Sequence, residues 1–182
     1  MAVEKPTVAV IGLGPVGSIL AAHLATSKVS VVVQDAMPHI RETVKKEGII
    51  ISGVTQLRAR ITNTAESIPS LAKFNPDIVF IVTKACYLKD VLPEIKQIWS
   101  PKLKIVSFQN GLGNEQAIAE QLGIDTAYRM VINYAGNLLH PGHAVMNWFQ
   151  PPNYVGAFHK GKYATDDTTK KIADMLTAAG LR

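Results

Sequence analysis

Three polar residues are the first candidates for chemistry, because each lies within two residues of the end of an apolar run. They are Asp35, Lys84 and Asn110. A carboxylate accepts hydrogen bonds from hydroxyls, an ammonium group pairs with anions, and a carboxamide both donates and accepts. Ligands of an open parallel sheet bind beyond the carboxyl ends of its strands. If the three runs are parallel strands, these side chains lie at one ligand-binding edge.

A glycine-rich turn comes before all three. Thr7–Ile11 is apolar and leads into the G-x-G-x-x-G segment Gly12-Leu13-Gly14-Pro15-Val16-Gly17, which opens a helical pattern. In this motif Gly12 makes the tight turn, Gly14 lets the backbone approach a pyrophosphate, and Gly17 lets helix and strand pack closely. Pro15 suits a first helical turn. We therefore predict a dinucleotide-binding turn, and the alternative is a glycine turn that only joins strand to helix.

Asp35 bears on which dinucleotide would bind. It lies 18 residues beyond Gly17, near the position where an acidic residue accepts hydrogen bonds from ribose hydroxyls and repels a 2′-phosphate. This favours NAD(H) over NADP(H). The alternative is a solvated carboxylate before the turn at Met37-Pro38.

Lys84 and Asn110 are the candidates for the reacting end of the ligand. Lys84 could orient nicotinamide or an anionic substrate, and the helix dipole disfavours the alternative of an exposed lysine at a helix start. Asn110 can hydrogen-bond both a carboxamide and a carbonyl. Because Asn110-Gly111 is also a common turn dipeptide, plain turn chemistry stays open.

Strands and helices alternate along the chain in the way that positions these residues. Apolar strand patterns end near residues 11, 34, 82 and 108, and each is followed by a helical pattern. This rhythm predicts an α/β fold with a doubly wound, mostly parallel Rossmann-type sheet. Beyond Thr126 we expect three shorter strands, Tyr128–Tyr134, Ala144–Phe149 and Tyr154–Phe158, as an antiparallel extension on the sheet edge. A last helix is expected between a cap at Thr165 or Asp166 and Gly180.

Composition narrows the class of protein. The 182 residues suit one domain, and no apolar run approaches the roughly 20 residues that span a bilayer. Glu4 and Pro6 interrupt any signal-peptide pattern, and the single Cys86 is compatible with a reducing compartment, so we expect a cytoplasmic protein without a membrane partner. The charge of +5 comes from scattered lysines, which argues against nucleic-acid binding.

Two other sites are interpreted as structural. For Cys86 we expect a packed thiol rather than a nucleophile, because no paired histidine follows it closely. His140-Pro141-Gly142-His143 has two imidazoles, but no carboxylate or thiol lies nearby in sequence to complete a metal site. We expect a turn there and no metal.

Four segments together resemble the ketopantoate reductase (2-dehydropantoate 2-reductase) family, over essentially the whole chain. They are Gly12-Leu13-Gly14-Pro15-Val16-Gly17, Val82-Thr83-Lys84-Ala85, Gln109-Asn110-Gly111-Leu112-Gly113 and Pro141-Gly142-His143-Ala144-Val145. The resemblance implies that the glycine turn binds NADP(H), that Lys84 lies beside nicotinamide, and that Asn110 touches cofactor and substrate. It further implies a cofactor contact by the backbone near Gly136.

The chain departs from the family pattern in two respects. Many members carry an arginine for the 2′-phosphate where this chain has Ala36, preceded by Asp35, so NAD(H) stays open beside NADP(H). The family's proton-donating lysine and much of its substrate pocket belong to a C-terminal helical domain. We expect residues 1–182 to be the dinucleotide-binding domain alone, and therefore incomplete for catalysis.

The resemblance implies NAD(P)H-dependent reduction of ketopantoate to pantoate in pantothenate biosynthesis. The expected partner is a small 2-oxo acid, and a homodimer is left open. Two alternatives are a related dehydrogenase of another oxo or imino acid, since a Rossmann half does not determine the substrate, and a non-catalytic dinucleotide-binding module.

Overall fold

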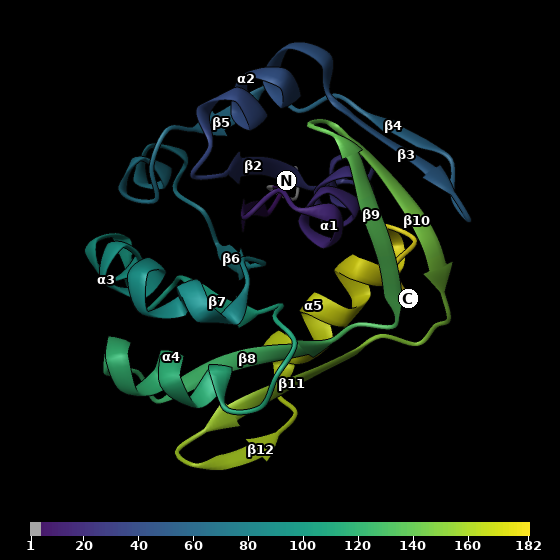
Figure 1. Cartoon of the computed structure of the whole chain (residues 1–182). Coiled ribbons are helices and arrows are strands. Elements are labelled where there is room, and N and C mark those ends of the chain that lie inside the picture. The colour runs from purple at the N-terminus through teal and green to yellow at the C-terminus, as the bar shows by residue number, and fades with distance from the viewer. Residues whose placement is uncertain (1–4) are drawn as a thin grey trace.

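The computed structural model describes residues 5–182 and contains two sheets. Figure 1 shows the larger sheet at the centre, with the smaller one beside α1. The strands are β1 (Thr7–Ile11), β2 (Ser30–Gln34), β3 (Ile49–Gly53), β4 (Leu57–Ala59), β5 (Asn63–Ala65), β6 (Ile78–Ile81), β7 (Lys104–Ser107), β8 (Thr126–Val131), β9 (Tyr134–His140), β10 (His143–Phe149), β11 (Tyr154–His159) and β12 (Lys162–Ala164). The helices are α1 (Pro15–Ala25), α2 (Pro38–Glu47), α3 (Leu88–Ile98), α4 (Asn114–Leu122) and α5 (Asp167–Ala178), with short 3₁₀ helices η1 (Pro69–Phe74) and η2 (Ala85–Tyr87).

The main sheet has the order β12-β11-β8-β7-β6-β1-β2-β5. The six strands from β8 to β5 are paired in parallel, which confirms the predicted α/β class. Strands β1, β6 and β7 are apolar and buried, as strands covered on both faces must be. The strand order reverses at β1, because β2 lies on one side of it and β6 on the other. This switch point is where such sheets bind ligands.

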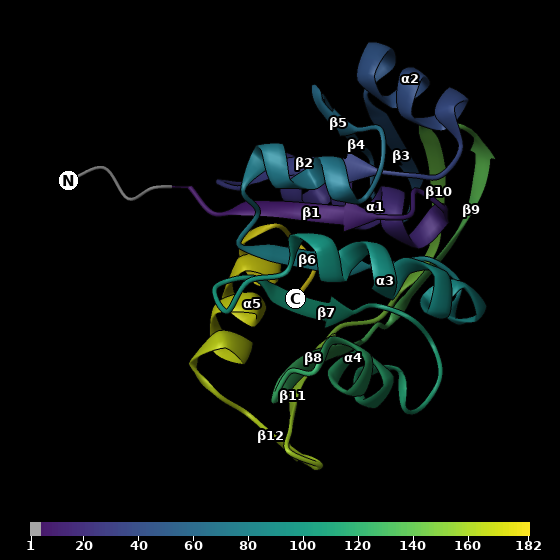
Figure 2. The ribbon, with the colours of Figure 1, turned by 90° about the vertical axis from the view of Figure 1, so that its left-hand side faces the viewer.

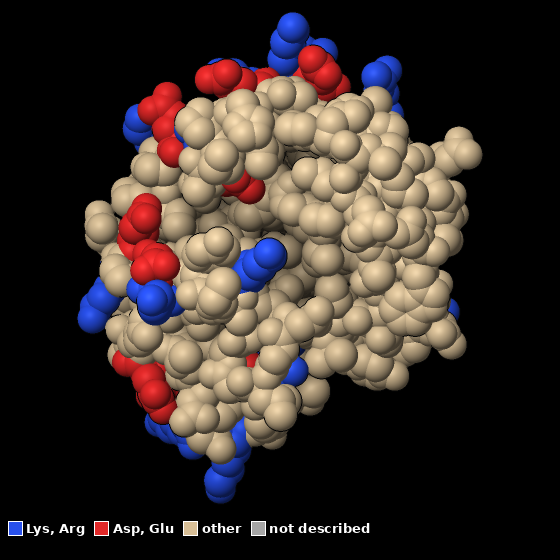
Figure 3. Space-filling view, in the orientation of Figure 1, with Lys and Arg blue, Asp and Glu red and all other residues tan. Residues whose placement is uncertain are grey.

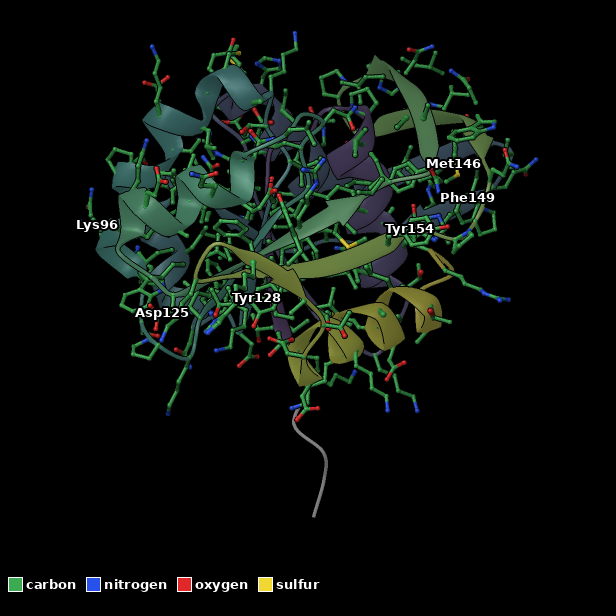
Figure 4. The ribbon with its side chains drawn as sticks, turned by 90° about the horizontal axis from the view of Figure 1, so that it is seen from below. Lys96, Asp125, Tyr128, Met146, Phe149 and Tyr154 are labelled. Carbon is green, nitrogen blue, oxygen red and sulfur yellow. The ribbon has the colours of Figure 1, made fainter. Side chains whose placement is uncertain are left out.

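Residues of β1 alternate between two hydrophobic cores on opposite faces of the sheet. Val8 and Val10 belong to the core under α1 and α5, whereas Ala9 and Ile11 belong to the core under α3 and α4. Figure 2 shows helices on both faces of the sheet. From below, Figure 4 shows Lys96 of α3 and Met146 of the second sheet at opposite ends of the molecule.

The second sheet, with order β4-β3-β10-β9, differs from the expectation for the C-terminal strands. The expected antiparallel edge extension is confirmed for β11, which pairs with β8. It is wrong for Tyr128–Tyr134, because β8 pairs in parallel with β7 and ends at Val131. The expected edge position of Ala144–Phe149 is wrong, because β10 pairs with β3 and β9 in the separate sheet. The reason lies in α1, where every residue from Gly17 through Leu24 is buried. A helix that is apolar all round needs cover on both sides, and the second sheet supplies it.

The helix boundaries follow local chemistry. Pro15 opens α1 and Pro38 opens α2. Asp166 caps α5 by accepting a hydrogen bond from the Thr169 N–H, which resolves the choice between two expected caps. Gly180, with φ of +82°, follows this helix. Among residues 5–182, no helix combines the length and apolarity needed to cross a membrane.

Candidate functional site

A cleft of about 780 Å³ opens at the carboxyl ends of β1, β2, β6 and β7. It is the hollow near the centre of Figure 3. Its walls include predicted residues from four separate segments, and these are Gly12, Gly14, Pro15, Val16, Asp35, Lys84 and Asn110. The parallel sheet thus brings together residues that are up to 98 positions apart in the sequence. Leu13 and Gly17 are buried beneath the turn and do not line the cleft.

A different steric constraint accounts for a glycine at each of the three motif positions. Gly12 has φ of +97°, and a Cβ there would lie 3.0 Å from the Thr83 backbone nitrogen. A Cβ on Gly17 would collide with the Gly12 carbonyl oxygen. Gly14 differs, because a Cβ there would meet no heavy atom within 4 Å and would point into open space. The open space at Gly14, together with the free N–H groups expected at the start of α1, fits a phosphate passing over the turn.

Asp35 is half-buried and holds the turn in place. One carboxylate oxygen accepts a hydrogen bond from the Leu13 N–H at 2.7 Å, and the other accepts from the Met37 N–H at 3.0 Å. The Asp35 carbonyl oxygen accepts from Arg41 at 2.5 Å. The carboxylate is therefore fixed by hydrogen bonds to both turns, while part of its surface stays exposed. Each carboxylate oxygen keeps a lone pair with which it can accept from a hydroxyl.

Lys84 and Asn110 face the same cleft from neighbouring loops. Both are exposed. Lys84 precedes η2, and Asn110 lies between β7 and α4, where its carbonyl oxygen accepts a hydrogen bond from Asn114 at 3.3 Å. Both side chains are free to engage a ligand at the end of the cleft away from Asp35.

Gly136 does not line the cleft. It lies in β9, where a Cβ would collide with the Val145 carbonyl oxygen and would lie 2.9 Å from Ile19. Close packing of the second sheet on α1 accounts for a glycine here. Its cofactor contact stays a prediction without support from the cleft geometry.

Two residues at or behind the cleft were not singled out from the sequence. Gln109 lines the cleft, and its buried amide donates to the Thr83 carbonyl oxygen at 2.9 Å. The signal was its place in the Gln109-Asn110-Gly111 motif. Tyr134 lies behind the turn and donates to the Val16 carbonyl oxygen at 3.2 Å. Burial raises the pKa of Tyr134 well above its ordinary value, so the hydroxyl remains a neutral donor.

The structure contradicts the interpretation of Cys86 and agrees with the turn expected between His140 and His143. Cys86 is exposed, so the expectation of a packed thiol is wrong. It lies in η2, just before the buried face of α3 begins at Leu88. His140 and His143 flank the β9–β10 turn, as expected, and His143 Nε2 lies 2.9 Å from Ser52 Oγ.

The charged side chains are distributed unevenly. Figure 3 shows them along the left, top and lower margins, whereas the right-hand face is largely free of them. In the sequence no Asp, Glu, Lys or Arg occurs between Arg129 and Lys160, a stretch that contains β9 and β10. In this view the charged side chains lie mainly over α2, α3 and α4, while α5 also carries four charged residues, Asp167, Lys170, Lys171 and Asp174.

The sheet order, the glycine turn at its switch point and the cleft beside it define a Rossmann-type α/β domain. Within that class, the chain belongs to the ketopantoate reductase family. A sequence profile described as ketopantoate reductase PanE/ApbA matches residues 8–160.

Comparisons with individual proteins agree with this family. The chain is 27% identical over 176 residues to a 2-dehydropantoate 2-reductase of Pyrococcus horikoshii, covering 94% of this chain and 53% of the relative. It is 23% identical to the enzyme of the same description from Lactococcus lactis, covering 96% of this chain and 54% of the relative. The chain thus spans about half the length of the curated relatives it matches.

Solved structures share the fold. A 2-dehydropantoate 2-reductase from Methylococcus capsulatus superposes with a TM-score of 0.79 at 22% identity, covering 96% of this chain and 55% of that one. A complex of D-mandelate dehydrogenase with NADH gives a TM-score of 0.76 at 21% identity, covering 97% of this chain and 54% of that one.

Proposed function

We propose that this chain is the NAD(P)H-binding half of a reductase that converts ketopantoate into pantoate, a step of pantothenate biosynthesis. The observation that carries the proposal is the convergence of the glycine turn, Asp35, Lys84 and Asn110 on one cleft. Family membership supports the reaction. The coverage of about half of each curated relative supports the assignment as one half of the enzyme.

The residues of the cleft fit a dinucleotide along its length. The pyrophosphate would lie over Gly14 at the start of α1, where no atom of residues 5–182 lies within 4 Å of an added Cβ. The adenosine ribose would bind at Asp35, and the nicotinamide end would reach Lys84 and Asn110. When bound, the cofactor supplies a hydride for the C2 carbonyl of a 2-oxo acid.

The chain's own residues orient the reactants. The Lys84 ammonium group would pair with the substrate carboxylate or the nicotinamide carboxamide, and the Asn110 amide would hold the carbonyl to be reduced. The proton that completes the alcohol would come from a lysine in the half of the enzyme outside this chain, as the family resemblance implies.

For the cofactor we propose a preference for NAD(H) over NADP(H). The Asp35 carboxylate is held by the Leu13 and Met37 N–H groups, Ala36 beside it offers no cation for a 2′-phosphate, and the nearby Arg41 already donates to the Asp35 carbonyl oxygen. A fixed negative charge there accepts ribose hydroxyls and repels the phosphate. We further propose a cytoplasmic protein, with a 2-oxo acid rather than nucleic acid or membrane as its partner.

The test is to measure ketopantoate-dependent oxidation of NADH and NADPH by the longest polypeptide that the gene encodes, alongside this 182-residue chain. We expect turnover by the longer polypeptide only, and NADH binding by both. Turnover with other 2-oxo acids but not ketopantoate would identify a related dehydrogenase. Tight NADH binding without turnover of any oxo acid would identify a dinucleotide-binding module.

A further inference from the structure

A buried amide joins two of the loops that line the cleft. Gln109 directly precedes Asn110, and only 5% of its surface is exposed. Its Nε2 donates to the Thr83 carbonyl oxygen at 2.9 Å and lies 3.2 Å from Thr83 Oγ1. Thr83 directly precedes Lys84. Among residues 5–182, these contacts are the only hydrogen bonds between segments 82–87 and 109–113.

Thr83 is also in contact with the glycine turn. A Cβ on Gly12 would lie 3.0 Å from the Thr83 nitrogen and 3.1 Å from its Cγ2, so the two backbones already lie close together. Thr83 therefore touches the turn on one side and Gln109 on the other. Three of the four segments that face the cleft meet at this threonine.

The loop that carries Asn110 has little packing of its own. Gly111 and Gly113 both have positive φ, at +118° and +83°, and Leu112 between them is 90% exposed. A segment with few buried contacts relies on specific hydrogen bonds for its position. Gln109 provides such a bond, and its Oε1 is in turn 3.4 Å from the Ser107 hydroxyl.

We propose that Gln109 is a positioning residue for the nicotinamide end of the cleft, because it holds Thr83 and thereby sets the placement of Lys84 relative to Asn110. This inference rests on the proposed function. Gln109 acts through its neighbours and needs no contact with the reacting atoms.

Loss of the Gln109 hydrogen bond should affect the binding of the two halves of the dinucleotide differently. The ADP-ribose half would bind at Gly14 and Asp35, and that region keeps its own hydrogen bonds, from Gly12 to Gln34 and from Leu13 to Asp35. The nicotinamide half would depend on Lys84 and Asn110. Gln109→Met keeps the length of the side chain but removes the donor. We expect it to raise the dissociation constant for NADH about tenfold, as for one lost oriented hydrogen bond, and that for ADP-ribose less than about twofold.

The experiment titrates NADH by fluorescence and ADP-ribose by calorimetry into the 182-residue chain. Gln97→Met is the matched control, because Gln97 is exposed on α3 and does not line the cleft. The inference is overturned if Gln109→Met weakens the binding of NADH and ADP-ribose equally, or weakens the binding of neither. If the unsubstituted chain binds neither ligand, the proposed function itself fails. If Gln109→Met does not fold, Thr83→Val, which removes only the Oγ1 contact, must still weaken NADH binding more than ADP-ribose binding.

A second variant gives a pH profile that a merely structural role would not produce. In Gln109→Glu, a protonated carboxyl can donate to the Thr83 carbonyl oxygen, whereas the carboxylate cannot. Burial raises the pKa of a carboxyl group. We therefore expect the NADH affinity of Gln109→Glu to recover as the pH falls from 8 to 6, with ADP-ribose affinity unchanged. A flat profile for NADH overturns the proposal.

Discussion

At the scale of single residues, Asp35 combines two roles that are usually considered separately. Its carboxylate supports the glycine turn through the Leu13 N–H, and the same group faces the cleft where the ribose would bind. Its effect on cofactor choice is therefore best tested as a ratio of two affinities, because a loosened turn should weaken both cofactors.

Asp35→Asn removes the charge and keeps one acceptor oxygen, so one of the two hydrogen bonds from the Leu13 and Met37 N–H groups is lost. We expect the ratio of NADPH to NADH dissociation constants to fall about tenfold, or ~1.4 kcal/mol, because the repulsion of a 2′-phosphate is lost. Asp77→Asn is the matched control, since its carboxylate also accepts a backbone hydrogen bond, from Thr7 at 2.9 Å, but does not line the cleft. An unchanged ratio in Asp35→Asn would refute the placement of the ribose.

A substitution of Asn110 tests the role proposed for the nicotinamide end of the cleft. In the longest polypeptide of the gene, Asn110→Ala should lower kcat at least about tenfold, because one oriented hydrogen bond to the reactants is lost. Steady-state kinetics with ketopantoate measure this. Asn114→Ala at the start of α4, which loses only the bond to the Asn110 carbonyl oxygen, should retain most of the activity. Kinetics unchanged by Asn110→Ala would contradict the assigned role.

At the scale of elements, two glycines in the turn between β1 and α1 should affect different properties. One should determine the stability of the fold and the other the affinity for the cofactor. Gly17→Ala should destabilise the protein, because its Cβ collides with the Gly12 carbonyl oxygen. Gly14→Ala should fold normally, since φ at Gly14 is −63° and its Cβ meets no atom of the described residues within 4 Å. It should nevertheless weaken NADH binding at least about tenfold by filling the phosphate path. Urea unfolding and NADH titration of both variants distinguish the two effects. Normal NADH affinity in Gly14→Ala would place the pyrophosphate elsewhere.

The packing of α5 against α1 should depend on pH through His23. Its Nδ1 lies 2.8 Å from the Ala179 carbonyl oxygen, and its Nε2 is buried without a partner among the described residues. Burial lowers the pKa of His23, although the hydrogen bond to Ala179 opposes this. The unfolded chain therefore takes up a proton first as the pH falls, so stability should decrease below about pH 6.5, by at most about 1.4 kcal/mol per pH unit, until the folded pKa is reached.

Urea unfolding at several pH values from 7.5 to 5.0 measures this dependence. His23→Gln should flatten that part of the curve, because the titrating group is gone. His39→Gln serves as the control, since His39 is exposed on α2 and should leave the curve unchanged. A pH dependence that survives in His23→Gln would assign the effect to another group.

At the scale of the whole molecule, the cleft should couple cofactor binding to stability. A ligand that binds only the folded chain at 100 times its dissociation constant adds about 2.7 kcal/mol to the free energy of unfolding. We expect NADH to raise the Tm of the 182-residue chain accordingly, in a thermal unfolding experiment, and Gly14→Ala to lose most of that increase. A Tm unaffected by NADH would contradict a preformed site.

The sequence predicted the main sheet and most of the cleft, because both depend on local patterns. Buried parallel strands appear as short apolar runs, and Asp35, Lys84 and Asn110 follow them directly. The second sheet was missed since β3 and β10 pair across more than 90 residues, and their own patterns do not specify the partner. The Gln109–Thr83 bond was missed for a similar reason, because it depends on β6 and β7 being neighbours.

The division of β1 between two cores has a consequence for how the family can vary. An insertion or deletion of one residue in β1 would turn Val8 and Val10 toward the core of Ala9 and Ile11, and also rotate the chain that enters the glycine turn. Exchanges among Val, Ile and Ala would disturb only local packing. In homologous genes, β1 should therefore tolerate many point substitutions and almost no change in length.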